Sequence, residues 1–203
     1  MKALFVALLV LVVLNGCERQ NAKQAPPVPM LASNSAANSV SINAATPDLA
    51  LKTWWKVLDA NSEYGYVTCI KAAPDESPLS VNRDKILTGD VKIYFSHHGD
   101  RCSRETYSRE IDEVKIESDT RATILATIKN STPLPGDVHL EEWQTKERTV
   151  GKKYKYLMER DSAQEGWKVS QVYSYTEYPV NGSNWDTEYD LKYVDTHAFV
   201  FGQ

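Results

Sequence analysis

A switch in hydrophobic period along the chain limits its fold more than any other feature. Between Leu51 and Leu58 the large apolar residues recur at i, i+3, i+4 and i+7, which is the spacing of one helical face. Residues 46–48 (Thr-Pro-Asp) supply a capping hydroxyl, a first-turn proline and an acid, so they predict where this helix begins. Residues 122–128 instead alternate apolar and polar side chains, the period of a half-buried strand. One early helix followed by antiparallel strands predicts an α+β fold.

Several other segments have the composition or alternation of strands. They are Val91–Phe95, Tyr107–Glu117, Lys153–Asp161, Trp167–Tyr175 and, as an ambiguous charge-rich case, Trp143–Val150. Ile111 falls out of phase with Val114 and Ile116, which predicts a bulge near residues 112–113 that bends the sheet. Residues 130–137 hold two prolines and a glycine and are predicted to form a loop.

Large aromatic side chains on the predicted inward faces are the candidates for a core or a pocket. Two adjacent tryptophans on one helical face carry a large apolar area, and packing in a core is favoured over a ligand platform. The pocket or core candidates are Trp54, Trp55, Tyr154, Tyr156 and Trp167.

The first seventeen residues combine a positive charge, an apolar run and a cysteine. A lysine is followed by an unbroken apolar run over residues 3–14, too short for a bilayer span, which needs about 20 residues. Residues 14–17 (Leu-Asn-Gly-Cys) resemble the lipobox, and an ordinary secretory peptide with a chance cysteine is the alternative. The resemblance implies a signal peptide over residues 1–16, cleavage before Cys17 and acylation of that cysteine.

The residues after the lipobox predict a destination and a tether. Glu18 stands where an aspartate would favour retention in the inner membrane, so resemblance to Gram-negative lipoproteins implies an outer-membrane anchor with the domain facing the periplasm. Residues 17–45 are rich in Ala, Asn, Ser, Gln and Pro, a composition that predicts a lipidated disordered tether. The lipid then serves as the contact with the membrane.

The two remaining cysteines, Cys69 and Cys102, are predicted to form a disulfide in this oxidising compartment, with two buried free thiols as the alternative. Residues 97–102 (His-His-Gly-Asp-Arg-Cys) could suggest a metal cluster. Adjacent histidines on an extended segment point to opposite sides, however, so a solvated loop is favoured and no metal site is predicted.

Three stretches follow one another along the chain: the helix TPDLALKTWWKVLD, the strands REIDEVKIESDTRATILATI and the hairpin KYKYLMERDSAQEGWKVSQV, which together span roughly residues 46–176. Together they resemble the nuclear transport factor 2-like superfamily. The resemblance implies a cone-shaped α+β domain over residues 46–179, with an N-terminal amphipathic helix packed on a curved antiparallel sheet. Residues 180–203 then form an aromatic-rich C-terminal extension.

Function is less constrained than fold, because the superfamily includes enzymes, ligand-binding proteins and interaction modules. A net charge of −4 argues against nucleic acid as a partner. No catalytic residue or cofactor is predicted. The leading prediction is a non-enzymatic binding or protein-interaction lipoprotein, of the immunity or inhibitor type among others, whose partner is an envelope protein or a small apolar ligand. An isomerase- or dehydratase-like enzyme using the cone pocket is the alternative.

The C-terminal aromatics have two interpretations. They could pack at the rim of the sheet, as tyrosine's strand propensity favours, or form a stacking surface for a glycan or a protein. The residues concerned are Tyr173, Tyr175, Tyr178, Trp185, Tyr189 and Tyr193.

Overall fold

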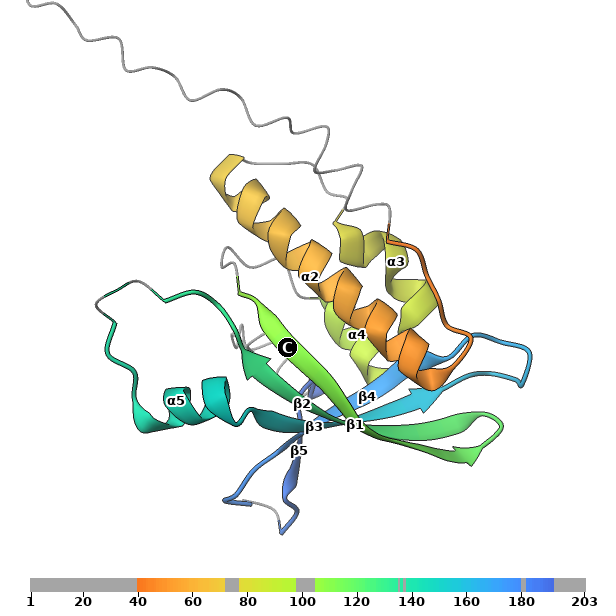
Figure 1. The fold of residues 1–203 in the computed structure, drawn as a ribbon. Coiled ribbons are helices and arrows are strands. Elements are labelled where there is room, and N and C mark those ends of the chain that lie inside the picture. Colours follow the sequence, from red (N-terminus) through yellow and green to blue (C-terminus); the bar gives the residue numbers. More distant parts are fainter. Residues whose placement is uncertain are drawn as a thin grey trace, which may run out of the picture. The chain divides into compact units, whose positions relative to one another are not determined.

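A computed structural model describes the chain over residues 40–71, 77–97, 105–134, 136, 138–179 and 182–191, without the side chains of 67–71 and 96–97. All of these residues belong to one compact unit of the chain. In this part of the chain, four helices and five strands occur in the order of three helices, two strands, a helix and three strands (Figure 1). The predicted α+β class is confirmed.

Helix α2 (Pro47–Lys71) begins where the sequence predicts. The Thr46 hydroxyl donates to Asp48 Oδ1 at 2.6 Å, and the Ala50 N–H donates to the Thr46 carbonyl at 3.0 Å. Leu51 and Trp54 lie fully inside the core. The capping residues therefore mark the start of α2, and the helical period of the apolar residues sets the face that it buries.

Two shorter helices follow, α3 (Pro78–Ile86) and α4 (Gly89–His97). The predicted strand over residues 91–95 is wrong, because this segment lies within α4. Val91 is fully buried whereas Ile93 is 46% exposed, so the true period here is that of a helix. The run Val-Lys-Ile-Tyr-Phe is compatible with both periods, and only the neighbouring elements decide between them.

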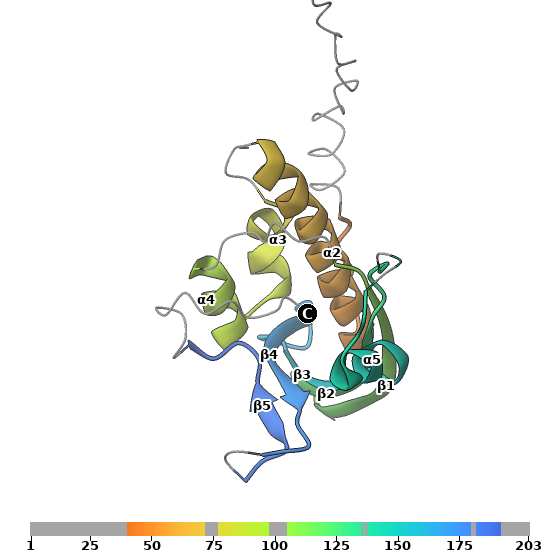
Figure 2. The same cartoon turned by 90° about the vertical axis from the view of Figure 1, so that its left-hand side faces the viewer.

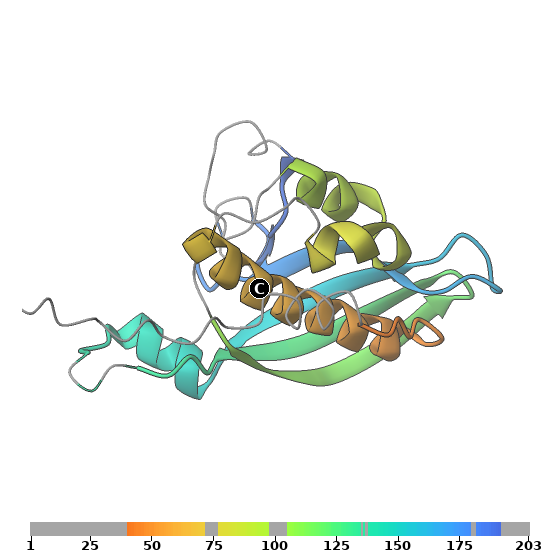
Figure 3. The same ribbon diagram turned by 90° about the horizontal axis from the view of Figure 1, so that it is seen from above.

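The strands form one curved, open sheet in the order β1-β2-β3-β4-β5, with every neighbouring pair antiparallel. Their bounds are β1 Tyr107–Ser118, β2 Arg121–Asn130, β3 Lys152–Glu159, β4 Lys168–Tyr175 and β5 Trp185–Thr187. The predicted bulge is confirmed, since the β1–β2 register passes from Ile111 opposite Ala126 to Glu113 opposite Leu125. Figure 3 shows α2, α3 and α4 on the same side of this sheet.

Helix α5 (Glu142–Thr149) lies between β2 and β3, so the ambiguous strand predicted over residues 143–150 is wrong. Glu141 and Gln144 form a reciprocal capping box at its start, and Gly151 ends the turn that follows it with a φ of +93°. Because α5 buries none of its side chains fully, no apolar stripe in the sequence revealed it. Figure 2 shows α5 near β1 and β2, away from α3 and α4.

The core lies between the three helices α2–α4 and the inner face of the sheet. The inward positions of β2 and β3 alternate as predicted, and β4 adds an apolar pair at Val169 and Val172. The buried hydrophobic residues of these strands are Ala122, Ile124, Ala126, Ile128, Tyr154, Tyr156, Met158, Val169 and Val172. None of the helices in the described ranges is long and apolar enough to cross a membrane.

Candidate binding pocket

All five aromatic residues predicted for the core or a pocket are buried. Trp55, Tyr154 and Tyr156 come together, since the Tyr156 ring centroid lies 6.0 Å from that of Trp55 and 6.5 Å from that of Tyr154. Trp54 packs edge-on against Phe95 of α4 instead, with centroids 5.2 Å apart. Trp167 lies under the Arg160 guanidinium, 4.5 Å from the ring. The helical tryptophans thus contact two different elements.

Tyr156 lies at a closed part of the core, where its hydroxyl is satisfied. The Trp55 indole N–H donates to this hydroxyl at 3.2 Å. The Arg109 guanidinium lies 5.8 Å from the Trp55 ring and pairs with Asp59 at 2.8 Å. Burial raises the pKa of the Tyr156 phenol, although its hydrogen bond from Trp55 opposes this shift. The phenol is therefore neutral and serves as a structural acceptor.

Tyr154, two residues earlier on β3, faces the same side of the sheet but is not satisfied. Its side chain is 1% exposed, and its hydroxyl has no hydrogen-bond partner in the described structure. Burial raises the pKa of the Tyr154 phenol strongly, and the charge of Glu188 raises it further. Buried polar atoms usually find a partner, but three in the described residues do not: the Tyr154 hydroxyl, Trp54 Nε1 and Arg109 Nε. Tyr154 is the one of these three residues that lines a pocket.

A pocket with a volume of about 520 Å³ adjoins Tyr154. It lies where β1 begins, β2 ends and β3 begins, and the loop after β2 and helix α5 complete its wall. Its lining residues are Glu105, Tyr107, Ile128, Asn130, Thr132, Leu134, Val138, Leu140, Trp143, Gln144, Glu147, Arg148, Lys152, Tyr154 and Glu188.

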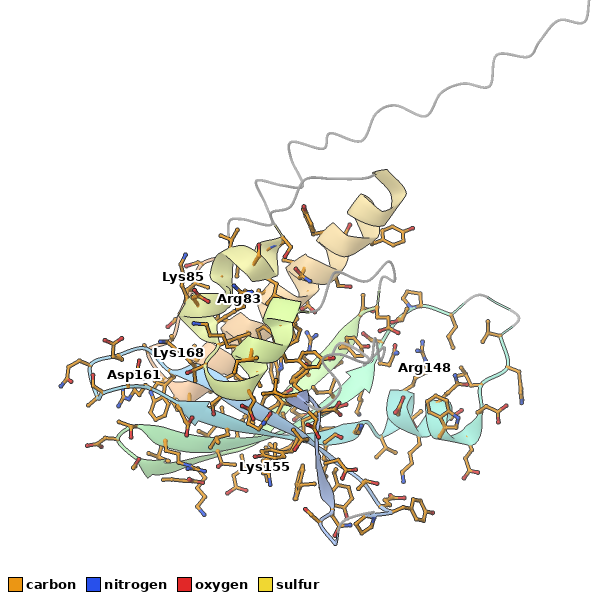
Figure 4. All side chains as sticks on the ribbon, turned by 180° about the vertical axis from the view of Figure 1, so that it is seen from behind. Arg83, Lys85, Arg148, Lys155, Asp161 and Lys168 are labelled. Carbon is orange, nitrogen blue, oxygen red and sulfur yellow. The ribbon has the colours of Figure 1, made fainter. Side chains whose placement is uncertain are left out.

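Arg148 holds the wall of this pocket in place. Its guanidinium donates to Asn130 Oδ1 at 3.0 Å and to the Thr132 carbonyl, so it ties α5 to the end of β2. On the other side, the Lys152 ammonium lies 3.2 Å from Glu188 Oε1. Figure 4 shows Arg148 at the α5 end of the structure, far from Lys168 and Asp161.

Tyr154 is the one lining residue that the sequence predicted for a core or pocket, and Arg148 and Glu188 are among those that sequence reasoning missed. The capping-box spacing of Glu141 and Gln144 could have indicated α5 and hence the position of Arg148. No local signal identifies Glu188, because it reaches the pocket only after β5 pairs with β4.

A second hollow, of about 350 Å³, lies at the opposite end, near the turns after β1 and β3. Several of its charged groups already have partners. Arg121 contacts Glu117 at 3.1 Å, Lys168 contacts Asp161 at 3.7 Å, and Arg160 donates to the Asp119 carbonyl at 2.6 Å. No buried polar atom in this hollow lacks a partner among the described residues. Unlike the pocket beside Tyr154, it therefore has no unsatisfied buried group in the described ranges for a ligand to bind.

The C-terminal aromatics divide between the two faces of the sheet. Tyr189 is buried among Tyr94 and Phe95, with centroid distances of 5.0 and 4.8 Å. Trp185 lies on the outer face beside Tyr175, and Lys155 Nζ is 4.7 Å from the Trp185 ring. Tyr178 is exposed, and Tyr193 lies outside the described residues. The outer face therefore carries a small aromatic surface.

The remaining predicted residues fall largely outside the described part. Cys17 and Cys102 lie beyond it, and Cys69 belongs to α2 with a side chain that is not described. His97 ends helix α4, so at least this histidine is not on the extended segment that the sequence suggested. Within the described part of the chain, no group of three or more His, Cys, Asp or Glu could hold a metal ion.

Comparisons with protein-family models, with curated proteins and with solved structures found no match to this chain.

Proposed function

We propose that this protein is a lipid-anchored envelope lipoprotein whose domain is a non-enzymatic binding module. The pocket beside Tyr154, with its volume of about 520 Å³, is the observation that carries the proposal. Small-molecule sites typically combine apolar walls with a few converging polar groups in a volume of about 300–1,000 Å³. A small apolar ligand, or a side chain inserted by an envelope protein, would fill this space.

The charges around Tyr154 favour binding over isomerase or dehydratase chemistry. Such chemistry needs a carboxylate that is free to take a proton, placed beside a donor to the developing oxyanion. Tyr154 could serve as the donor. Two of the three carboxylates that line the pocket are already engaged, however: Glu188 pairs with the Lys152 ammonium at 3.2 Å, and Glu105 accepts a hydrogen bond from the Tyr107 hydroxyl at 2.7 Å.

The cone-shaped architecture of nuclear transport factor 2-like domains is part of this proposal. Its support is the curvature of the sheet, the hydrogen bond from Trp55 of α2 to Tyr156 of β3, and a pocket at one end of the core. In this arrangement the N-terminal helix packs on the inner face of the sheet, and the loop after β2 with α5 narrows the open end.

The cellular address completes the proposal. Residues 14–17 support acylation of Cys17, and Glu18 supports transfer to the outer membrane with the domain in the periplasm. The outer-face pair of Tyr175 and Trp185, together with the exposed Tyr178, is compatible with a protein partner, including the target of an immunity or inhibitor protein.

Co-purification from envelope extracts tests the binding role. Val138 lines the pocket and is 46% exposed, so Val138→Trp should fill the pocket without disturbing the core. Val150→Trp is the matched control, because Val150 is exposed and lies outside the pocket. A protein or extracted small molecule should co-purify with the wild type and with V150W, but not with V138W. If the same amount co-purifies with all three proteins, the binding site lies outside this pocket. If nothing co-purifies with the wild type, the proposed binding function is wrong.

Membrane fractionation tests the anchor separately. The Cys17→Ser variant should leave the membrane pellet, since it lacks the sulfur that receives the lipid. A variant that still pellets with membranes would show that Cys17 is not the anchor, whatever the pocket binds.

A further inference from the structure

The unsatisfied hydroxyl of Tyr154 limits the kind of molecule that the pocket can take, and this inference rests on the proposed function of the same pocket. The hydroxyl oxygen is shielded from solvent and has no partner in the described structure. The free energy lost by leaving a buried polar group unmet is recovered when a ligand supplies the missing hydrogen bond. The ligand should therefore carry a polar atom that can reach this group.

The phenol acts as a donor toward that atom. Its burial and the nearby Glu188 both keep the proton on the oxygen. Glu188 pairs with Lys152 through Oε1, and the Tyr154 hydroxyl donates no hydrogen bond to it or to any other group in the described structure. The matching group on a ligand is an oxygen with free lone pairs, such as the carbonyl of a ketone, ester or amide.

The charges of the pocket decide against an anion. Three acids line it, Glu105, Glu147 and Glu188, against the two bases Lys152 and Arg148, so its lining carries one negative charge in excess. Lys152 pairs with Glu188, while Arg148 donates to Asn130 and to the Thr132 carbonyl. A carboxylate placed near Tyr154 would meet an excess of negative charge, whereas a neutral carbonyl would not.

Part of the lining is suited to hydrocarbon, beside the polar Asn130, Thr132 and Gln144. Leu134, Val138 and Leu140 come from the loop after β2, and Trp143 comes from α5. Ile128 of β2 is buried beside them. These side chains form an apolar wall for the hydrocarbon part of a ligand. Transfer of that hydrocarbon from water to the pocket would supply most of the affinity.

We infer that the pocket binds an uncharged amphiphilic small molecule. Its hydrocarbon body lies against the loop and α5, and a carbonyl-type oxygen accepts a hydrogen bond from the Tyr154 hydroxyl. Acyl esters and neutral ketones have this chemistry, whereas fatty acids at neutral pH do not.

Two probes of equal chain length test the inference, decan-2-one and decanoate at pH 8. Equilibrium dialysis would use the full chain carrying Cys17→Ser, which keeps covalent acyl chains out of the assay. Decan-2-one should bind at least about tenfold more tightly than decanoate. Adding Tyr154→Phe should weaken decan-2-one binding by about three- to tenfold, the worth of one neutral hydrogen bond. Adding V138W should abolish binding, and V150W should leave it unchanged.

The outcomes separate this inference from the proposed function. If decanoate binds as tightly as decan-2-one, or if Y154F leaves the affinity for decan-2-one unchanged, the ligand class is wrong while the pocket remains a binding site. If neither probe binds but a species still co-purifies in a manner blocked by V138W, the ligand class is again wrong and the binding role stands. If neither probe binds and nothing co-purifies, both proposals fail. The comparison of probes on the chain with an intact Tyr154 remains decisive even if Y154F does not fold.

Discussion

Tyr154 and Tyr156 are neighbours on the inner face of β3, and both are buried, yet they meet opposite surroundings. Tyr156 accepts a hydrogen bond from Trp55 of α2 at a closed part of the core. Tyr154 has no such partner in the described ranges and borders the pocket. The difference arises because Trp55 of α2 supplies a donor to Tyr156, whereas the loop after β2 and helix α5 line the pocket beside Tyr154. One end of the core is thus built for stability and the other leaves room for a ligand.

Truncation at the closed end should have the largest effect. Trp55→Ala removes a buried indole together with the donor to Tyr156, so it should lower the free energy of unfolding by about 3–5 kcal/mol. Urea unfolding measures this loss. The matched change at the open end is Trp143→Ala, which should cost less than about 1 kcal/mol because Trp143 is 60% exposed. Equal losses of unfolding free energy for the two variants would show that the two ends of the core do not differ in stability.

A substitution in the turn between α5 and β3 should have the second largest effect on stability. Gly151 has a φ of +93°, and a Cβ there would lie 2.8 Å from Thr127 Cγ2 and 2.9 Å from the Ile128 carbonyl. Gly151→Ala should therefore cost about 2–3 kcal/mol and should disturb the placement of α5 over the pocket. Gly136→Ala is the control, since nothing lies within 4 Å of its added Cβ. A harmless G151A variant in the same unfolding assay would show that this turn tolerates a side chain.

Removing each hydroxyl tests the comparison directly. Tyr156→Phe leaves the Trp55 N–H buried without its acceptor and should cost about 1–2 kcal/mol. Tyr154→Phe removes a hydroxyl that lacks a partner, so it should be neutral or slightly stabilising in the absence of ligand. Differential scanning calorimetry of the pair gives the order of stabilities. A Y154F variant less stable than Y156F would refute the assignment of the two hydroxyls.

A rise to alkaline pH should have the smallest effect on stability. Both phenols have raised pKa values because of burial, so the unfolded chain loses these protons first as the pH rises past about 10. Their contribution to stability is full below pH 10 and is lost above it, by about 0.8 kcal/mol per tyrosine at pH 10.5. The double variant Y154F/Y156F should therefore show a weaker fall in stability between pH 9 and pH 10.5 than the wild type. Parallel curves would mean that the phenols ionise alike in the folded and unfolded chain.

Sequence reasoning reached the core more accurately than it reached the pocket. Strict alternation identified Tyr154 and Tyr156 as inward residues, and the phase slip after Ile111 located the bulge of β1. It was wrong at α4 and α5. The short apolar run of α4 is compatible with two periods, and α5 is an exposed helix without a buried stripe. An apolar period in the sequence arises where one face of an element is buried against another element. A helix such as α5, which buries no face fully, therefore carries no such period.

The sequence by itself determined the α+β class, the start of α2, the inward aromatic residues and the bulge, because each depends on spacing within a few residues. Only the tertiary structure decided which tyrosine is satisfied, since Trp55 and Tyr156 are 101 residues apart. It likewise decided that Glu188 meets Lys152, across 36 residues and through the pairing of β5 with β4. Hydrogen bonds and ion pairs act over a few ångströms, so the partners of a side chain depend on which distant elements the fold brings beside it.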